Sequence, residues 1–351
     1  MPSIAKPLIP IPSLQRRNDL GLSPRDYEGA MSTLCAGCGH DSVTAALVQA
    51  LFELSIPPYK VAKLSGIGCS SKTTAYFAGD AHGFNSVHGR MPTIATGANA
   101  ANRDLYYVGV SGDGDSLSIG LGHLAHAVRR NVRMLYVIEN NGVYGLTKGQ
   151  FSASADLGSL SKKGEANAFA PVDPLLMALS LGATFVARAF SGDKGRLVPL
   201  LKAGLLHRGL ALIDVISPCV QFNDHEGSTK SYRFVREHEV AATDFVEPRS
   251  EIVAAVPDEG VITVAMHDGS PLTFRAVPES GYDPTDRVGA AAYLQERHAH
   301  GEIVTGLVYA DESVPDLHDL SGTPKEPLAT LPFERLCPGS EALKDLQEGF
   351  R

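Results

Sequence analysis

Oxygen ligands for a cation occur at two points of the sequence that are one helix and one strand apart. Gly112-Asp113-Gly114-Asp115 is followed, after 24 residues, by the pair Asn140-Asn141. Carboxylate and amide oxygens are ligands that Mg²⁺ accepts, and glycines let backbone N–H groups approach phosphate oxygens. Either half alone would be only a surface turn or a loop. Together, at this spacing, they indicate a site for magnesium and a diphosphate.

Cysteines form a second set of candidate ligands. Cys35 and Cys38 form a Cys-x-x-Cys pair, while Cys69 and Cys219 stand alone. These four thiolates could complete one ligand shell, and metal ligation fits a reducing, cytoplasmic location better than disulfides do. Ligand number and softness do not separate a structural zinc ion from an iron–sulfur cluster. Cys337 is expected to be a bystander thiol.

The segments around these residues alternate between strand-like and helical hydrophobic patterns. Such alternation predicts an α/β fold with a largely parallel, doubly wound sheet. In these sheets ligands bind outside the carboxyl ends of the strands, and both polar motifs, Cys69 and Cys219 follow predicted strands. Strands are predicted at 59–67, 105–110, 134–138, 184–189 and 211–216, and helices at 41–56, from Ser116 to 130, 174–181 and 195–207.

The chain is expected to divide into three parts. An N-terminal arm at 1–29 precedes a cofactor-binding domain at 30–245, and a C-terminal extension occupies 246–351. In the extension two short strands flank a predicted hairpin turn at 267–270, and the tail after 310 is rich in Pro, Asp and Glu. These features predict a small appendage, to which the sequence assigns no function.

The composition argues against two kinds of partner. The chain has 351 residues, of which 44% are hydrophobic and 20% charged, so a packed core is expected. A net charge of -8 without a cluster of Lys and Arg argues against nucleic acid. The opening residues are interrupted by prolines and no run of 18 apolar residues occurs, so neither a secretory signal nor a membrane segment is expected. A cytoplasmic protein is predicted.

Three motifs in this order resemble those of the β subunits of 2-oxoacid:ferredoxin oxidoreductases, in the form that acts on 2-oxoglutarate. The motifs are Cys35-Ala-Gly-Cys38-Gly-His, Gly-Asp-Gly with Asn-Asn, and the late Ser-Pro-Cys, and the resemblance covers about residues 30–235. It implies the diphosphate-binding domain of thiamine diphosphate enzymes. The side chains of Asp113 and Asn141 and the carbonyl of Val143 would bind Mg²⁺. The resemblance further implies that Gly112, Gly114 and Asp115 contact the cofactor and that Cys35, Cys38, Cys69 and Cys219 hold a [4Fe–4S] cluster.

The same resemblance places four more residues near the substrate. His88, in a stretch similar to Leu-His-Gly-Arg, would assist proton transfer or hold the bound intermediate. Arg90 would be a carboxylate clamp or a surface ion pair. The stretch Leu-Thr-Lys-Gly-Gln is similar to the form found in 2-oxoglutarate enzymes. In it Thr147 would contact the diphosphate, and Lys148 would either meet the distal carboxylate of 2-oxoglutarate or be a solvated loop charge.

The activity that the resemblance implies is the oxidative decarboxylation of a 2-oxoacid with coenzyme A as acyl acceptor. Thiamine diphosphate would act as electron sink, and the cluster would pass electrons to ferredoxin. This chain has no room for the pyrimidine-binding domain, so an α subunit and an (αβ)₂ assembly are expected. Two alternatives remain open: a non-oxidative thiamine diphosphate decarboxylase or synthase with structural zinc, and a non-catalytic, zinc-stabilised binding module.

Overall fold

A single large sheet organises the chain. The computed structural model describes residues 16–161, 163–246, 261–266, 271–276 and 281–350. All neighbouring strands of the large sheet run parallel except β13, which is antiparallel to β7. In spatial order the strands are β2 (His82–Asn85), β1 (Val61–Ser65), β3 (Tyr106–Gly112), β4 (Met134–Asn140), β8 (Leu210–Ile216), β7 (Phe185–Phe190), β13 (Ile303–Ala310) and β9 (Glu239–Ala241).

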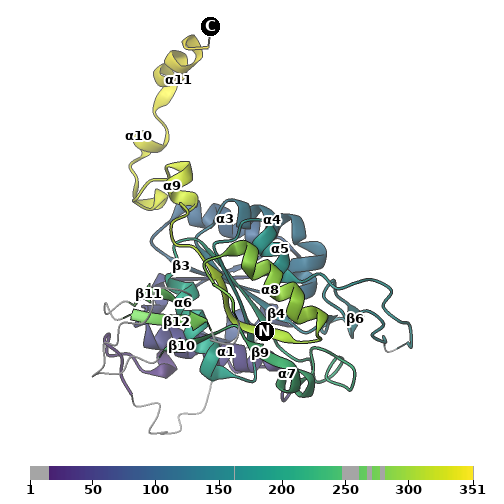
Figure 1. The fold of residues 1–351 in the computed structure, drawn as a ribbon. Helices are drawn as coiled ribbons and strands as arrows, with labels where there is room; N and C mark the ends of the chain where they lie inside the picture. Colours follow the sequence, from purple (N-terminus) through teal and green to yellow (C-terminus); the bar gives the residue numbers. More distant parts are fainter. Residues whose placement is uncertain (1–15, 162, 247–260, 267–270, 277–280, 351) are drawn as a thin grey trace.

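Helices cover both faces of this sheet (Figure 1). One face packs against α1 (Gly39–Glu53) and α6 (Lys194–Leu206), and the other against α3 (Met91–Ala101), α4 (Leu121–Arg129), α5 (Pro174–Ser180) and α8 (Arg287–Ala299). Every residue of β4 and β8 is buried, as expected for central strands covered on both faces. The doubly wound α/β fold predicted from the sequence is therefore confirmed.

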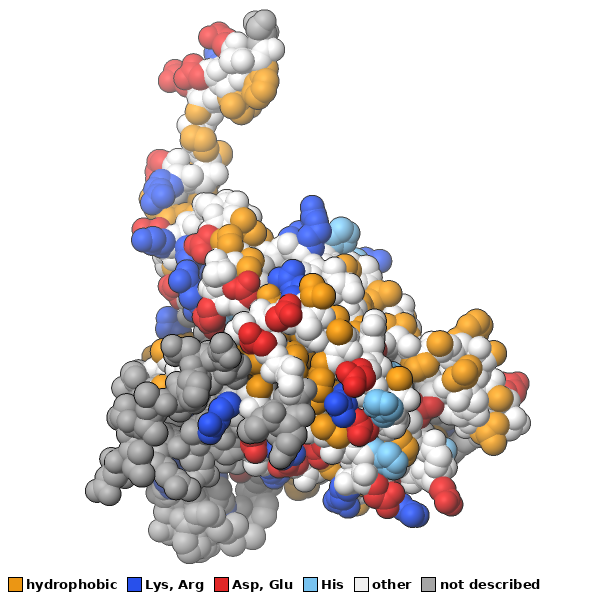
Figure 2. All heavy atoms as spheres, viewed as in Figure 1, with side chains coloured by type: hydrophobic (Ala, Val, Ile, Leu, Met, Phe, Trp, Pro, Cys, Tyr) orange, Lys and Arg blue, Asp and Glu red, His pale blue; other side chains and the backbone are white. Residues whose placement is uncertain are grey.

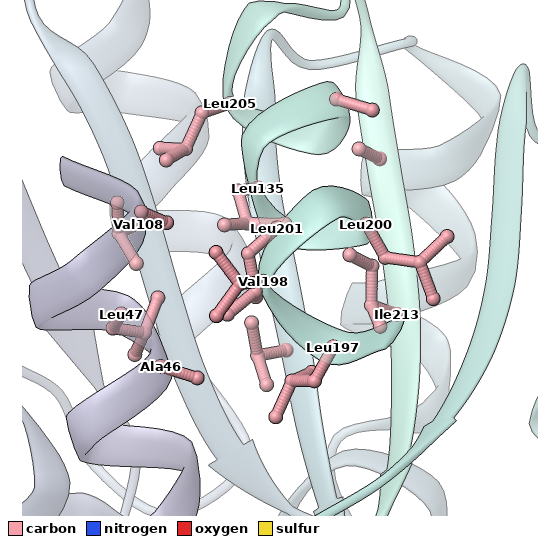
Figure 3. Close-up of a cluster of buried hydrophobic side chains, with 14 of the residues drawn as sticks. Ala46, Leu47, Val108, Leu135, Leu197, Val198, Leu200, Leu201, Leu205 and Ile213 are labelled. Carbon is pink, nitrogen blue, oxygen red and sulfur yellow. The ribbon is translucent and has the colours of Figure 1, made fainter. Parts of the chain in front are cut away.

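The core on the α1 and α6 face consists of aliphatic side chains from both helices and the central strands (Figure 3). Leu47 of α1 and Leu201 of α6 lie over Val108 of β3 and Leu135 of β4, and all four side chains are at most 1% exposed. Because side chains alternate along a strand, the odd-numbered residues of β4 face these helices, whereas Met134, Tyr136 and Ile138 face α3, α4 and α5. This alternation decides on which side each polar strand-end residue lies.

Local sequence fixes where several helices begin. The Asp173 side chain accepts hydrogen bonds from the backbone of Leu175 and Leu176 at the start of α5, where Pro174 occupies the first helical position. Asp193 and Asp286 cap α6 and α8 in the same way. The short helices are α2 (Thr73–Tyr76), α7 (Tyr232–His238), α9 (Leu317–Ser321), α10 (Phe333–Leu336) and α11 (Gly339–Glu348).

The sequence predicted a small appendage at 246–351, but part of this segment, β13 (Ile303–Ala310), belongs to the large sheet. Strand β13 lies inside the large sheet between β7 and β9, and α8 packs on the same sheet face as α5. Val304, Leu307 and Val308 are buried, so this strand completes the main core. A strand that pairs within the main sheet belongs to the same domain, however far along the chain it lies from the other strands.

A small antiparallel sheet accounts for the hairpin expected after residue 246. It contains β10 (Thr243–Val246), β12 (Pro271–Ala276) and β11 (Val261–Ala265), and β11 pairs with β12 as predicted. The predicted turn at 267–270 lies outside the described residues. Phe274 and Ile262 join the core beneath α6, so this sheet also packs on the domain.

The last helices project from the body as an extended tail (Figure 1). Apolar side chains of the tail are solvent-exposed, including Phe333 at 72%, Leu346 at 61% and Phe350 at 86% (Figure 2). Cys337 lies in this tail, away from the other cysteines, and is exposed. In the described part of the chain no helix is both long and apolar enough to cross a membrane.

A buried ion triad links the central strands to α5. Arg188 on β7 donates from Nε to Asp214 on β8 at 2.7 Å and from Nη2 to Asp173 at 3.0 Å. Asn140 donates from Nδ2 to the other oxygen of Asp214 at 3.0 Å. Burial, the largest single influence, would raise the pKa of Asp173, but the Arg188 guanidinium and the backbone N–H groups of Leu175 and Leu176 together lower it. The contribution of Asp173 to stability is therefore present above about pH 4 and is lost as the pH falls below that.

Replacing Asp214 with asparagine is expected to destabilise the fold. The substitution removes a carboxylate that is 1% exposed and leaves the buried guanidinium of Arg188 with one anionic partner. Breaking a buried pair in this way costs about 3–5 kcal/mol in free energy of unfolding, which urea denaturation would measure. Glu237→Gln, which removes the exposed pair with Arg233, should change the free energy by less than about 1 kcal/mol. Equal stability of the two variants would contradict this account.

Candidate functional site

The predicted ligands gather at the carboxyl ends of four adjacent strands. Cys69 follows β1, Asp113 follows β3, Asn141 follows β4 and Cys219 follows β8, and these strands are neighbours in the order β1, β3, β4, β8. Their parallel pairing brings all four carboxyl ends to one edge of the sheet. This is the edge where open α/β sheets bind their ligands, as the sequence predicted.

Asp113 is almost wholly buried, and its hydrogen bonds converge on one oxygen. Oδ2 accepts from the hydroxyls of Ser152 and Ser154 and from the backbone N–H of Gly142 at 3.0 Å. Oδ1 takes no part in these three hydrogen bonds, so it is the oxygen that we expect to face a cation. Burial raises the pKa of Asp113, although these hydrogen bonds act in the opposite direction. A bound divalent cation would favour the charged form, so the carboxylate fits a magnesium ligand.

Asn141 and Val143 lie next to Asp113. The side-chain oxygen of Asn141 accepts from the backbone N–H of Val143 at 3.1 Å, and its backbone carbonyl accepts from Asn223 at 2.8 Å. Val143 begins a two-residue strand, β5 (Val143–Tyr144), which pairs with β6 (Gln150–Phe151). Hydrogen bonds therefore fix the chain where the hairpin begins, at Asn141, and where its second strand pairs with the first. Direct contact of Asn141 and Val143 with Mg²⁺ stays a prediction.

The Gly-Asp-Gly turn leads directly into a helical segment. A π-helical turn, η5 (Gly114–Ile119), precedes α4, so the helix begins slightly earlier than Ser116, where the sequence placed it. Tyr144 donates from its hydroxyl to the carbonyl of Gly114 at 3.0 Å. A Cβ at Gly114 would lie 2.5 Å from the Tyr144 ring, which explains the glycine. At Gly112 a Cβ would meet only the Ser70 hydroxyl, at 3.1 Å.

Asp115 holds neighbouring loops together with both of its oxygens. Oδ1 accepts from the backbone of Gly89 at 2.7 Å and of Ile67 at 3.2 Å, while Oδ2 accepts from Ser111 at 2.6 Å. His88 also contacts Oδ1 through Nδ1. The carboxylate thus orients the imidazole of His88, and its contact with a cofactor stays a prediction.

The other predicted substrate residues are exposed near this edge. Arg90 caps α3 and forms no ion pair with the described residues. Thr147 donates from its hydroxyl to the side-chain oxygen of Gln150 at 2.6 Å. Lys148 has a φ of 79°, which is strained for a residue with a side chain. The β5–β6 loop therefore presents Lys148 to solvent beside the site, and its contact with the substrate stays a prediction.

Two thiols lie close to the same glycine. A Cβ at Gly145 would be 3.4 Å from Cys69 Sγ and 3.6 Å from Cys219 Sγ. The hydrogen atom in place of a methyl group keeps space open beside the two sulfurs. All five cysteines are free thiols. The position leaves room for a group bound to both sulfurs, which fits a metal-containing centre.

The Cys-x-x-Cys pair lies within electrostatic reach of these two thiols. Cys35 interacts with Cys69 and with Cys219, and Cys38 interacts with Cys219. Burial is the main cause that raises the pKa of Cys38 to about 12, and it also raises the pKa of Cys69 and of Cys219. Without a metal these thiols are therefore protonated, and binding of a metal would displace the protons.

The spacing of the ligands does not suit one small ion. Among the described residues no three His, Cys, Asp or Glu side chains are arranged to hold a single metal ion. A tetrahedral zinc ion, with bonds of about 2.3 Å, needs four sulfurs within about 4 Å of one another. The four cysteines share a region without that close convergence.

Two of the predicted magnesium ligands, Asn141 and Val143, lie on the same short stretch of chain as Gly145, which the thiols of Cys69 and Cys219 approach. Val143 is two residues from Gly145, and a residue spans at most about 3.6 Å of extended chain, so their Cα atoms are at most about 7 Å apart. The Cys69 sulfur is a further 3.4 Å from the Cβ position of Gly145. The two candidate centres are consequently neighbours within one site.

A buried polar network lies behind the cysteines. Glu139 on β4 is 0% exposed, accepts from Thr73 Oγ1 at 3.0 and 3.1 Å, and lies 3.6 Å from Nδ1 of His40. His40 Nδ1 is also 2.6 Å from Ser217 Oγ. Burial raises the pKa of Glu139 well above its usual value and lowers that of His40 to about 4. The network is thus held by hydrogen bonds between largely neutral groups.

The sequence reasoning missed several of these residues. Ser152 and Ser154, which bind Asp113, alternate along the chain just after β6, and that spacing points both hydroxyls to one side. Nothing in the sequence pointed to a role for Gly145, because glycines are common in loops for many structural reasons. Glu139 was visible only as the polar end of a hydrophobic strand.

Comparison with known proteins now identifies the class of this site. Residues 66–215, which run from just after β1 almost to the end of β8, match the family described as thiamine pyrophosphate enzyme, C-terminal TPP binding domain. The fold and this match therefore define a diphosphate-binding domain of a thiamine diphosphate enzyme.

Relatives with assigned names narrow this class. The chain is 43% identical over 199 residues to the 2-oxoacid:ferredoxin oxidoreductase subunit beta of Saccharolobus solfataricus, covering 56% of this chain and 65% of that protein. It is 42% identical over 191 residues to the 2-oxoglutarate oxidoreductase subunit KorB of Mycobacterium tuberculosis, covering 54% of this chain and 51% of that protein. It therefore spans about half to two thirds of the length of these two relatives.

Two further comparisons cover more of the relative. The 2-oxoglutarate synthase subunit KorB of Methanocaldococcus jannaschii is 34% identical over 214 residues, which cover 59% of this chain and 77% of that protein. A 2-oxoglutarate:ferredoxin oxidoreductase from Magnetococcus marinus, solved with 2-oxoglutarate, coenzyme A and succinyl-CoA bound, matches with a TM-score of 0.71 and 30% identity, over 93% of this chain and 98% of that chain. The chain belongs to the family of 2-oxoacid:ferredoxin oxidoreductase β subunits.

Proposed function

We propose that this chain, together with an α subunit, catalyses the coenzyme A-dependent oxidative decarboxylation of 2-oxoglutarate and passes the electrons to ferredoxin. The observation that carries the proposal is the shared strand-end site. The buried carboxylate of Asp113 accepts from the backbone of Gly142, three residues before Gly145, and a Cβ at Gly145 would lie 3.4 Å from Cys69 Sγ and 3.6 Å from Cys219 Sγ. Membership of the family supports the same reading.

The oxygen ligands fit magnesium and a diphosphate. Asp113 would bind the ion through Oδ1, with Ser152, Ser154 and Gly142 fixing Oδ2. Asn141 would supply its side-chain oxygen, and Val143 its carbonyl. Thiamine diphosphate, when bound, supplies the electron sink for loss of CO₂ from a 2-oxoacid. The protein's own contribution at this end is to hold the diphosphate in one position.

The four thiols fit a [4Fe–4S] cluster better than a zinc ion. In such a cluster the four cysteines are shared among several iron atoms, whereas one zinc ion must contact all four sulfurs itself. The spacing of Cys35, Cys38, Cys69 and Cys219 does not provide a single-ion site among the described residues. The open space at Gly145 is the position where a larger group would lie. A cluster of this kind fits a reducing, cytoplasmic location.

His88 and Lys148 would act on the substrate. Nδ1 of His88 lies against Asp115, so Nε2 is the atom that would exchange a proton with the substrate. Lys148 would attract the distal carboxylate of 2-oxoglutarate, a group that pyruvate lacks. Arg90, at the start of α3, would hold the carboxylate of the substrate. Thr147, in the β5–β6 loop, would hold the diphosphate.

An assay of the assembled enzyme tests the proposal. The chain would be co-expressed with its α subunit under anaerobic conditions and supplied with coenzyme A, a viologen acceptor, and pyruvate, 2-oxoglutarate or a branched oxoacid. We expect acceptor reduction that requires coenzyme A and is fastest with 2-oxoglutarate. Decarboxylation without acceptor reduction would contradict the oxidative reaction, and no Mg²⁺-dependent thiamine diphosphate binding by the assembly would contradict the catalytic role altogether.

Replacing Lys148 with methionine tests the substrate preference. A charge-assisted hydrogen bond contributes about 1.5–3 kcal/mol, so kcat/KM for 2-oxoglutarate should fall about 10- to 100-fold, while turnover of pyruvate should not fall. Lys163→Met, which removes an exposed lysine from the following loop, is the matched control and should leave both rates unchanged. An equal loss with both substrates would indicate a loop defect instead of carboxylate recognition.

A further inference from the structure

Two of the three chain segments that carry the candidate cluster cysteines place a polar side chain against one buried carboxylate, and the third reaches it through His40. Thr73 lies four residues after Cys69, and its hydroxyl donates to both oxygens of Glu139. His40 lies two residues after Cys38, with Nδ1 3.6 Å from Glu139 Oε2. Ser217 lies two residues before Cys219, and its Oγ is 2.6 Å from His40 Nδ1. We call these four residues, Glu139, His40, Thr73 and Ser217, the Glu139 hub.

The position of Glu139 follows from strand alternation. The odd-numbered residues of β4 face α1 and α6, so Glu139 points to the side on which α1 begins at Gly39. All four members of the hub are buried: Glu139, Thr73 and Ser217 are 0% exposed and His40 is 1% exposed. A buried polar group without partners is costly, so these hydrogen bonds fix the positions of all the groups that share them.

The backbone tightens the same arrangement. The N–H of Gly39 donates to the carbonyl of Pro218 at 3.2 Å, which joins the segment of Cys38 to that of Cys219. A Cβ at Gly39 would lie 2.6 Å from the Ser217 hydroxyl and 2.8 Å from the Ser217 carbonyl carbon. Only a glycine lets the two segments approach this closely. The separation of Cys38 from Cys219 is therefore set within a few residues of the hub.

We propose that Glu139 is a positioning residue, which through the Glu139 hub fixes the relative positions of Cys38, Cys69 and Cys219 and so gives the sulfur centre one defined geometry. The inference rests on the proposed function, because it takes these cysteines to hold a [4Fe–4S] cluster. Glu139 touches neither substrate nor thiamine diphosphate in this account. It acts through the three loops, as groups behind metal ligands generally do.

The predicted consequence is a change in the centre itself. In the anaerobically purified αβ assembly, Glu139→Ala should split or broaden the electron paramagnetic resonance signal of the reduced cluster, because the cysteine loops take up more than one arrangement. Iron release to a chelator should become about 10- to 100-fold faster, the range found when groups that support metal ligands are removed. Glu139→Gln keeps the size of the side chain and an acceptor for Thr73, and it should restore a single signal and slow release.

Two comparisons separate this effect from a general loss of stability. Asp214→Asn removes a different buried carboxylate from the adjacent strand β8, so it should lower the free energy of unfolding but leave the signal unchanged. If Glu139→Ala does not fold, the smaller changes Thr73→Val and Ser217→Ala take its place, and each should speed iron release with little change in shape.

The outcomes distinguish the inference from the proposed function. A wild-type signal and wild-type iron release in Glu139→Ala, or in both smaller variants, would overturn the Glu139 hub and leave the proposed function intact. An equal change of the signal in Asp214→Asn and in Glu139→Ala would also overturn the Glu139 hub without affecting the proposed function. Absence of any iron–sulfur signal in the wild-type assembly would overturn the assignment of the cluster, and the hub with it.

Discussion

Replacing Asp113 with asparagine is expected to weaken the Mg²⁺-dependent binding of thiamine diphosphate by the αβ assembly about 100-fold or more, since removing even a supporting residue of a metal site costs 10- to 100-fold. The hydroxyls of Ser152 and Ser154 both donate to Oδ2 of Asp113. An asparagine must therefore turn its carbonyl oxygen toward these donors. That orientation places its NH₂ group where Oδ1 would bind the cation, and an amide nitrogen is not a ligand for Mg²⁺.

Titration calorimetry with thiamine diphosphate at fixed Mg²⁺ would measure the loss. The folded protein itself should remain stable, because the substitution removes a buried charge whose pKa is raised by burial. Asp156→Asn is the matched control: that carboxylate accepts from Thr229 and Lys230 in a neighbouring loop, so its loss should leave binding nearly unchanged. Wild-type affinity in Asp113→Asn would show that the cation binds elsewhere.

Replacing Cys69 with serine is expected to remove most of the protein-bound iron and of the visible absorbance. A serine hydroxyl stays protonated at neutral pH and is a hard ligand, so it does not replace a thiolate on iron. Cys219→Ser should have the same effect, because the Cys69 and Cys219 sulfurs both lie close to Gly145. Iron analysis and absorbance of anaerobically purified assemblies would measure both.

Cys337→Ser is the control for these cysteine variants. Cys337 is an exposed thiol in the projecting tail, so its loss should change neither the iron content nor the spectrum. Stoichiometric zinc in a colourless wild-type protein would contradict the cluster. Equal iron in Cys69→Ser and wild type would show that Cys69 is not a ligand.

The oxygen ligands were predictable from sequence because their geometry follows from chain order. Asp113 and Asn141 end consecutive strands joined by one helix, and such strands pair in parallel as neighbours. Their carboxyl ends must then meet at one edge, whatever the details of packing. The positions of Cys69 and Cys219 followed by the same reasoning.

The parts that were not predicted depend on contacts between distant segments. β13 is a run of eight mostly apolar residues, which is the signal of a buried strand. The strand lies between β7 and β9, is antiparallel to β7, and is more than 100 residues away from β7 along the chain. The local hydrophobic pattern contains none of this information. The role of Glu139 was not predictable for the same reason. Its burial depends on contacts with α1, Thr73 and Ser217, which are distant from it along the chain.

The short stretch from Asn141 to Gly145 leaves little freedom for redesign. Its first residues are predicted to bind the cation and its last lies close to two sulfurs, so inserting a residue would move one end relative to the other. A change in length near Asn141 is therefore expected to shift Gly145 relative to the cysteines as well. The same restriction on loop length applies to natural variation of this segment.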